Sequence, residues 1–241
     1  MNLFRKLAGE FYATALFTFV VYATSNEAIL VGFAFWACVQ GTGYIIPFHL
    51  NPMVQLSSYV HKRLTHYLTQ KDKHYLLCSI STQMIGSLVG ALFAWWIYEP
   101  VFYFKPGAGY TASQYYFAEM IFSSQLVLIC IALGQWSESR LIGLFAISGA
   151  ITTGILTVGK ISGACFNPTV CFMINFVHAM KSDTDEGLEY LWLYIVGPFF
   201  GAIVGTIIGI ILHPKHEEKK RVQISNTVPT EEAAHLDSPK H

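Results

Sequence analysis

Residues 161–172 read Ile161-Ser162-Gly163-Ala164-Cys165-Phe166-Asn167-Pro168-Thr169-Val170-Cys171-Phe172, and no charged residue occurs from Ile161 to Met180. Asn is a favoured helix N-cap because its side-chain oxygen accepts a backbone N–H, and Pro suits the first helical position, where it loses no hydrogen bond. We therefore expect a helix from Pro168 to His178. About 11 residues span roughly 16 Å, which is half of a ~30 Å hydrocarbon core. The stretch predicts a half-helix that starts inside a membrane.

A second Asn-Pro pair, Asn51-Pro52, lies inside another uncharged run, from Ala28 to His61, and an apolar segment of about ten residues follows it. Asn51 and Asn167 lie 116 positions apart. A pair of glycines with a four-residue spacing also recurs 115 positions further on: Gly86 and Gly90, then Gly201 and Gly205. The matched spacings predict an internal repeat that contains two half-helices.

The composition indicates a membrane protein. Hydrophobic residues make up 53% of the 241-residue chain and charged residues 12%, which leaves too little polar surface for a soluble globule. The formal net charge is zero, so nothing favours a nucleic-acid partner. The five cysteines show no metal-ligand spacing, and we expect no metal, cofactor or disulfide.

Six segments are long enough to cross a bilayer as helices of an all-α membrane protein. They are 7–25, 28–48, 75–98, 115–134, 141–159 and 189–212. Polar connectors such as 61–74 separate them. We expect one channel-like domain at 1–212, with repeats at about 7–98 and 115–212, followed by a polar, disordered tail at 213–241.

The Lys and Arg residues predict the orientation of these spans. With the N-terminus inside, every Lys and Arg except Lys105, Lys160 and Lys181 falls on the inner side. The positive-inside rule therefore predicts that both termini are cytoplasmic. In this topology the two half-helices enter from opposite sides, and their N-termini meet at mid-depth.

Two acidic residues lie well inside predicted spans, Glu10 in the first and Glu119 in the fourth. A re-entrant loop leaves backbone N–H groups unpaired at membrane depth, and a buried carboxylate can accept several of them. A glutamate at the interfacial end of a helix is the simpler alternative for either residue alone. The matched positions favour the interpretation that Glu10 and Glu119 clamp the two loops.

These motifs together resemble the aquaporins, or major intrinsic proteins, over nearly the whole of 10–205. The residues that carry the resemblance are Glu10-Phe11, His49-Leu50-Asn51-Pro52, Glu119-Met120, Ser162-Gly163-Ala164, Asn167-Pro168 and Tyr194-x-Val196-Gly197-Pro198. The resemblance implies a bundle of six helices and two half-helices in the lipid bilayer, assembled as a homotetramer with one pore per subunit. It also implies that His49 and the two Asn-Pro motifs line the pore.

The sequence departs from the family pattern at the pore. Met53 and Thr169 replace the alanines of the usual Asn-Pro-Ala triplets, and Val170 stands where most members carry an arginine. Family spacing puts the filter at Val31, Ile155, Ala164 and Val170, so we expect an aliphatic filter. Cys171 stands where members specialised for glycerol carry Asp, which disfavours such a specialisation.

The resemblance implies a passive channel for water and small neutral solutes such as glycerol, urea, ammonia or hydrogen peroxide. Two other classes share parts of the pattern. A secondary transporter also uses inverted repeats, but no acid lies at mid-depth to couple an ion. A non-conducting structural or junctional membrane protein stays open as an alternative, because altered triplets and an apolar filter are compatible with lost conduction. The histidines show no paired metal spacing, so an enzyme is not expected.

Overall fold

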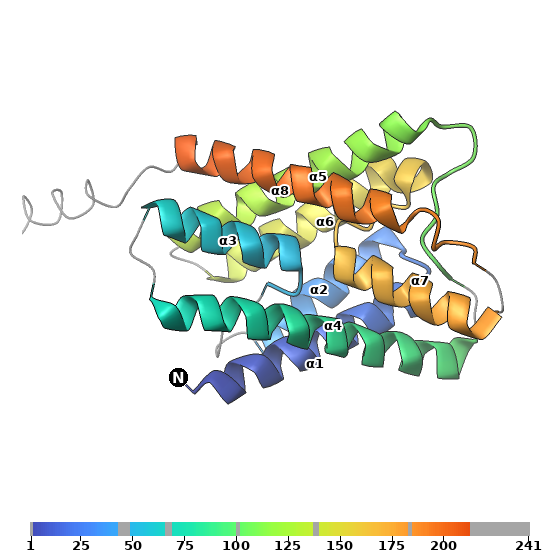
Figure 1. Cartoon of the computed structure of the whole chain (residues 1–241), viewed down its shortest axis with the longest axis horizontal. Coiled ribbons are helices and arrows are strands. Elements are labelled where there is room, and N and C mark those ends of the chain that lie inside the picture. Colours follow the sequence, from blue (N-terminus) through green and yellow to red (C-terminus); the bar gives the residue numbers. More distant parts are fainter. Residues whose placement is uncertain are drawn as a thin grey trace, which may run out of the picture.

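The computed structural model describes residues 2–42, 49–65, 69–99, 102–136, 140–182 and 185–212. All regular secondary structure in these ranges is α-helical (Figure 1). The helices are α1 (Leu3–Ala23), α2 (Ala28–Thr42), α3 (Pro52–Thr65), α4 (Gln70–Tyr98), α5 (Ala112–Trp136), α6 (Arg140–Ser162), α7 (Pro168–Ser182) and α8 (Leu191–Leu212). The expected all-α architecture is confirmed, and the predicted tail at 213–241 lies outside the described residues.

Helices α4, α5, α6 and α8 are each long and apolar enough to cross a membrane. Helix α1 has 21 residues, about 31 Å at 1.5 Å per residue, but Arg5, Lys6 and Glu10 lower its mean hydropathy. Helix α2 is an apolar helix of 15 described residues. Its expected continuation to Phe48 lies outside the described residues.

Helices α3 and α7 have 14 and 15 residues, and they point toward the middle of the bundle from opposite ends (Figure 1). Both begin at the proline of an Asn-Pro pair, and both run further than expected. The prediction that 61–74 is a connector is wrong, because α3 continues to Thr65 and α4 begins at Gln70. Lys62 and Arg63 in the last turn of α3 favour its helix dipole, and a Thr69–Asp72 capping box starts α4.

Glycines bring the helices of each repeat into backbone contact. A Cβ atom on Gly86 or Gly90 of α4 would lie 2.6 Å from the carbonyl oxygen of Phe11 or 2.1 Å from that of Ala15, both in α1. The equivalent glycines of α8 meet α5 in the same way, with Gly201 against Met120 and Gly205 against Ser124. Only glycine, which has no side chain, permits this close approach. The hydrophobic effect does not drive helices together in lipid, so close packing of their backbones stabilises the pairs instead.

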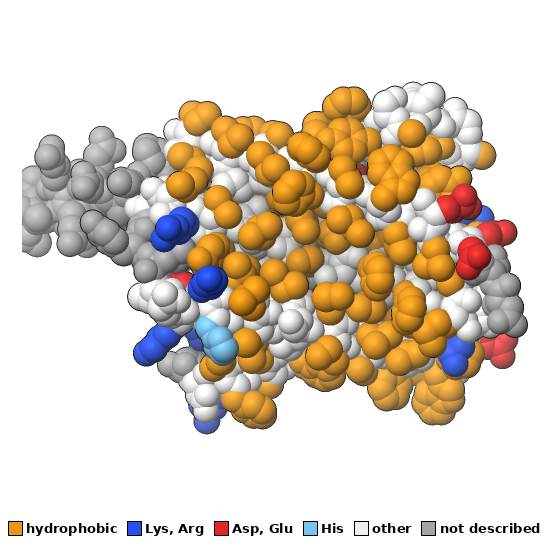
Figure 2. Space-filling model, viewed as in Figure 1, with side chains coloured by type: hydrophobic (Ala, Val, Ile, Leu, Met, Phe, Trp, Pro, Cys, Tyr) orange, Lys and Arg blue, Asp and Glu red, His pale blue; other side chains and the backbone are white. Residues whose placement is uncertain are grey.

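The surface of the bundle is strongly asymmetric in charge along its long axis. Hydrophobic side chains cover the middle of the face in Figure 2, Lys and Arg gather at the end that carries the N-terminus, and acidic side chains gather at the other end. The C-terminal end of α8 lies at the same end as the N-terminus (Figure 1). An uncharged band between two charged rims is the surface expected of an integral, multi-pass membrane protein.

The glycine contacts generate a stability prediction. Gly90→Ala is expected to destabilise the fold by about 1–3 kcal/mol, because the new methyl group would overlap the Ala15 carbonyl and force α1 and α4 apart. Gly159→Ala in α6 is the matched control, because the nearest atom to its Cβ lies at an ordinary 3.6 Å. Thermal unfolding in detergent should separate the two variants, and equal melting temperatures would contradict the packing argument.

Candidate functional site

The two Asn-Pro motifs form N-caps of the same geometry. The Asn51 Oδ1 accepts a hydrogen bond from the backbone N–H of Met53 at 2.9 Å, and the Asn167 Oδ1 accepts one from Thr169 at 3.2 Å. Pro52 and Pro168 occupy the first helical positions, where a missing N–H costs nothing. Each asparagine side chain is thereby fixed at the N-terminus of its half-helix.

The same two side chains tie the half-helices to each other. The Asn51 amide donates to the carbonyl oxygen of Phe166 at 2.8 Å, and the Asn167 amide donates to that of Leu50 at 2.7 Å. Leu50 and Phe166 adopt left-handed backbone conformations, with φ of 52° and 55°, which turn these carbonyls toward the opposite loop. Each amide has a second N–H without a protein acceptor among the described residues.

Glu10 lies beneath the first loop and is completely buried. Its carboxylate accepts the backbone N–H of His49 at 3.0 Å and that of Leu50 at 3.2 Å. The Gln83 amide of α4 donates a third hydrogen bond at 3.0 Å, and the His49 Nδ1 lies 3.5 Å away. The carboxylate therefore satisfies loop donors that would otherwise be unpaired at membrane depth.

Glu119 makes the corresponding contacts in the second repeat and is also completely buried. It accepts the backbone N–H groups of Cys165 at 3.1 Å and Phe166 at 2.9 Å, and the Ser162 hydroxyl at 2.7 Å. Gly197 of α8 leaves room for this side chain, because a Cβ there would lie 2.8 Å from the Glu119 Cβ. Two carboxylates from equivalent helices thus hold two equivalent loops.

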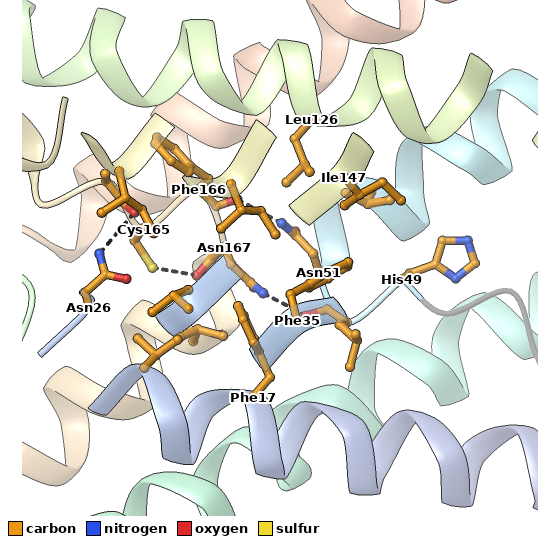
Figure 3. Close-up of a pocket in the computed structure, with 18 of the residues that line it drawn as sticks. Phe17, Asn26, Phe35, His49, Asn51, Leu126, Ile147, Cys165, Phe166 and Asn167 are labelled. Carbon is orange, nitrogen blue, oxygen red and sulfur yellow. Dashed lines mark hydrogen bonds between the residues drawn. The ribbon is translucent and has the colours of Figure 1, made fainter. Parts of the chain in front are cut away.

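A narrow cavity passes through the point where the half-helices meet, and Figure 3 shows the side chains that line it. Its free space for water-sized molecules is ≈ 40 Å³. Four polar side chains reach the cavity, and they are Asn26, His49, Asn51 and Asn167. The rest of the wall is mainly apolar, with Phe17, Phe35, Leu126 and Ile147 among its members (Figure 3).

The four residues expected at the filter all line this cavity. Val31, Ala164 and Val170 are each 1% exposed, and Ile155 is 9% exposed. Val31 lies in the first turn of α2, Ile155 near the end of α6, Ala164 in the second loop and Val170 in the first turn of α7. The four residues therefore come from four separate segments, and no charged side chain occurs among the described residues that line the cavity.

Phe104, Cys165 and Asn26 are among the lining residues that were not predicted from the sequence. Phe104 comes from the segment before α5. Its backbone N–H donates to the Asn175 Oδ1 of α7 at 2.8 Å, and its carbonyl oxygen accepts from the Asn175 Nδ2 at 2.7 Å. Cys165 contacts the Asn167 carbonyl through its thiol, and Asn26 comes from the turn between α1 and α2. The sequence held one signal for this contact: Asn175 is a polar residue in an otherwise apolar half-helix, and its buried side chain needs a partner such as the Phe104 backbone.

A wider vestibule of ≈ 560 Å³ adjoins the cavity at the acidic end of the molecule. Glu27, Lys105 and Lys160 line it, so charges of both signs surround the entrance. Lys105 donates to the Tyr103 hydroxyl at 3.0 Å, and this hydrogen bond raises the pKa of Lys105. The lysine therefore remains cationic over the physiological pH range.

The clamp geometry predicts the effect of removing Glu119. Glu119→Ala would leave its three donors unpaired, at about 1–3 kcal/mol for each group, so a large loss of folded protein is expected. Glu27→Ala is the matched control, because that exposed carboxylate caps only the Leu30 N–H. Yield and melting temperature in detergent measure the difference, and a Glu119→Ala protein as stable as the control would show that the carboxylate does not support the loop.

Comparisons with known proteins place these features in a family. The sequence model of the major intrinsic proteins matches residues 1–209. Aquaporin NIP3-1 of Zea mays is 24% identical over 93% of this chain and 76% of its own length. The glycerol uptake facilitator protein of Streptococcus pneumoniae is 25% identical over 73% of this chain and 79% of its own length.

A solved structure gives the same result for the fold. The aquaglyceroporin from Plasmodium falciparum superposes with a TM-score of 0.69 at 19% identity, over 88% of this chain and 98% of that one. The eight helices of the described residues, with α3 and α7 opposed, agree with this similarity. The chain belongs to the major intrinsic protein family, whose members are membrane channels and not enzymes.

Proposed function

We propose that this protein is a passive channel for water and small neutral solutes, and that the cavity between the half-helices is its pore. The observation that carries the proposal is the pair of reciprocal hydrogen bonds that hold Asn51 and Asn167 at the cavity wall. The free N–H of each amide can donate to the oxygen of a passing solute. The curated relatives include proteins named as aquaporins and as glycerol uptake facilitators, which supports small neutral permeants.

The half-helices supply the barrier to ions. Each N-terminus carries about +0.5 elementary charge, and both point at the centre of the pore, so cations and hydronium meet an unfavourable potential there. A water that accepts hydrogen bonds from both amides is oriented with its own hydrogens outward, which interrupts a proton relay. Neutral molecules experience no such barrier.

The filter of this pore is the aliphatic ring of Val31, Ile155, Ala164 and Val170. Desolvation at an apolar constriction costs more for a polar solute than passage beside a fixed donor. The ring therefore ranks solutes by size and polarity, and it lacks the fixed positive charge that would oppose protons. A non-conducting structural protein of the same fold is the alternative, and it would share the helices without passing solute.

The distribution of basic residues on the surface supports an orientation of the protein in the membrane. Basic residues gather at the end that carries the N-terminus, which by the positive-inside rule is the cytoplasmic end. The half-helix α3 then enters from the cytoplasmic side and α7 from the opposite side. We propose a homotetramer with one pore per subunit, as the family resemblance implies.

A permeability measurement distinguishes conduction from a closed pore. Purified protein in liposomes is expected to raise osmotic water permeability at least several-fold over protein-free liposomes, with a low activation energy, in stopped-flow light scattering. The same vesicles report urea, glycerol and ammonia uptake. Water permeability equal to that of empty liposomes, from protein shown to be folded, would favour the non-conducting alternative.

Val170→Arg tests the filter. The arginine would occupy space in the aliphatic ring and add a fixed positive charge, so glycerol and urea fluxes should fall by about tenfold or more and any proton leak should fall with them. Water flux should be kept or only partly reduced. Leu212→Arg is the control, because Leu212 is exposed at the C-terminal end of α8. Val177→Arg would not serve as a control, because Val177 is fully buried. Unchanged fluxes in Val170→Arg would show that Val170 does not line the constriction.

A further inference from the structure

We infer that Asn26 forms a hydrogen-bond-accepting subsite at the outer end of the pore, which selects neutral solutes that carry N–H or O–H donors. This inference rests on the proposed function. Asn26, Phe104 and Ile155 line both the narrow cavity and the wide vestibule, so they mark the junction between them. Asn26 is the one among these three whose side chain is polar.

The backbone fixes the position of Asn26. Only Thr24, Ser25, Asn26 and Glu27 separate α1 from α2. The N–H of Asn26 bonds to the Val21 carbonyl at 2.9 Å and that of Ser25 to the Tyr22 carbonyl at 3.1 Å, which is the hydrogen-bond pattern of a Schellman C-cap. Ser25 and Asn26 have φ of 51° and 57°, a left-handed conformation that Asn tolerates better than most residues. The turn therefore holds the amide against the second loop.

The amide of Asn26 is oriented by that loop. Its Nδ2 donates to the carbonyl of Gly163 at 2.8 Å and makes a longer contact to that of Ala164 at 3.4 Å. Both hydrogens thus face the loop, and Oδ1 points toward the cavity (Figure 3). Oδ1 accepts no hydrogen bond from the described residues, although Asn26 is only 9% exposed. This acceptor atom is not completely buried, so a solute in the cavity can reach it and donate a hydrogen bond to it.

On the side of the narrow cavity, the residues around this acceptor are mainly apolar. Val31, Ile155, Ala164 and Val170 line the same cavity as Asn26, and Phe104 is also apolar. Deeper in the pore, the amides of Asn51 and Asn167 offer donors. A solute with both donor and acceptor groups can donate a hydrogen bond to Asn26 and later accept one from Asn51 or Asn167. Water, urea, simple amides and polyols have this chemistry, whereas solutes with only acceptor groups lack half of it.

Two solutes of similar size test the subsite. Urea and dimethyl sulfoxide each have four heavy atoms and one acceptor oxygen, but urea has N–H groups where dimethyl sulfoxide has methyl groups. After subtraction of protein-free vesicles, the wild-type protein should conduct urea about tenfold faster than dimethyl sulfoxide, the effect of about one hydrogen bond. Asn26→Gly removes the acceptor and suits the positive φ, so it is the variant that best preserves the turn.

The preference for urea is expected to shrink to within about threefold in Asn26→Gly. Asn26→Leu, which keeps the side-chain volume, should lose the preference in the same way without widening the pore. Phe104→Leu is the control, because it alters the same junction without touching the acceptor and should keep the preference.

An undiminished urea preference in folded Asn26→Gly, or its absence in a wild-type protein that conducts water, would overturn the subsite and leave the channel intact. A wild-type protein that conducts neither water nor urea would overturn the proposed function itself, and the subsite with it.

Discussion

The reciprocal hydrogen bonds between Asn51 and Phe166 and between Asn167 and Leu50 are the contacts on which the rest of the structure depends. They join two half-helices that enter the bundle from opposite ends and would otherwise end in unpaired backbone groups at membrane depth. The left-handed conformations of Leu50 and Phe166 are costly for non-glycine residues, and buried carboxylates compensate for them. Glu10 and Glu119 therefore belong to the same structural unit as the asparagines, because they fix the loops that carry the carbonyls.

The remaining helices position this unit. Glycine contacts bring α1 against α4 and α5 against α8, so that each glutamate lies directly behind its loop. The lumen that results is mainly aliphatic, with polar groups only at a few levels along it. The wall is apolar except at Asn26, Asn51, Asn167 and His49. A solute in the cavity therefore has few groups with which to replace the hydrogen bonds that it made to water. Selectivity in such a pore depends on where those groups stand and on whether each donates or accepts.

The sequence was informative wherever a residue type has few structural uses. Three such features predicted the fold class: Asn-Pro in an uncharged run, paired glycines at a 115-residue offset, and Glu in an apolar span. The first two allow few backbone arrangements, and the third requires partners for a buried charge. The C-terminal end of α3 was missed because His61, Lys62 and Arg63 are polar, and polarity alone does not separate a helix end from a loop. Asn26 and Phe104 were missed for a different reason. Their roles depend on turns that bring distant segments together, and no periodicity in the chain encodes that contact.

The central claim is that Asn51 and Asn167 face a continuous water-filled lumen, and an experimental density map that resolves ordered water tests it most directly. The account predicts a single file of water peaks through the cavity, with one peak about 2.7–3.2 Å from the Nδ2 atoms of both asparagines. A lumen that is dry at this level, or blocked by side chains so that no water reaches either amide, would contradict it.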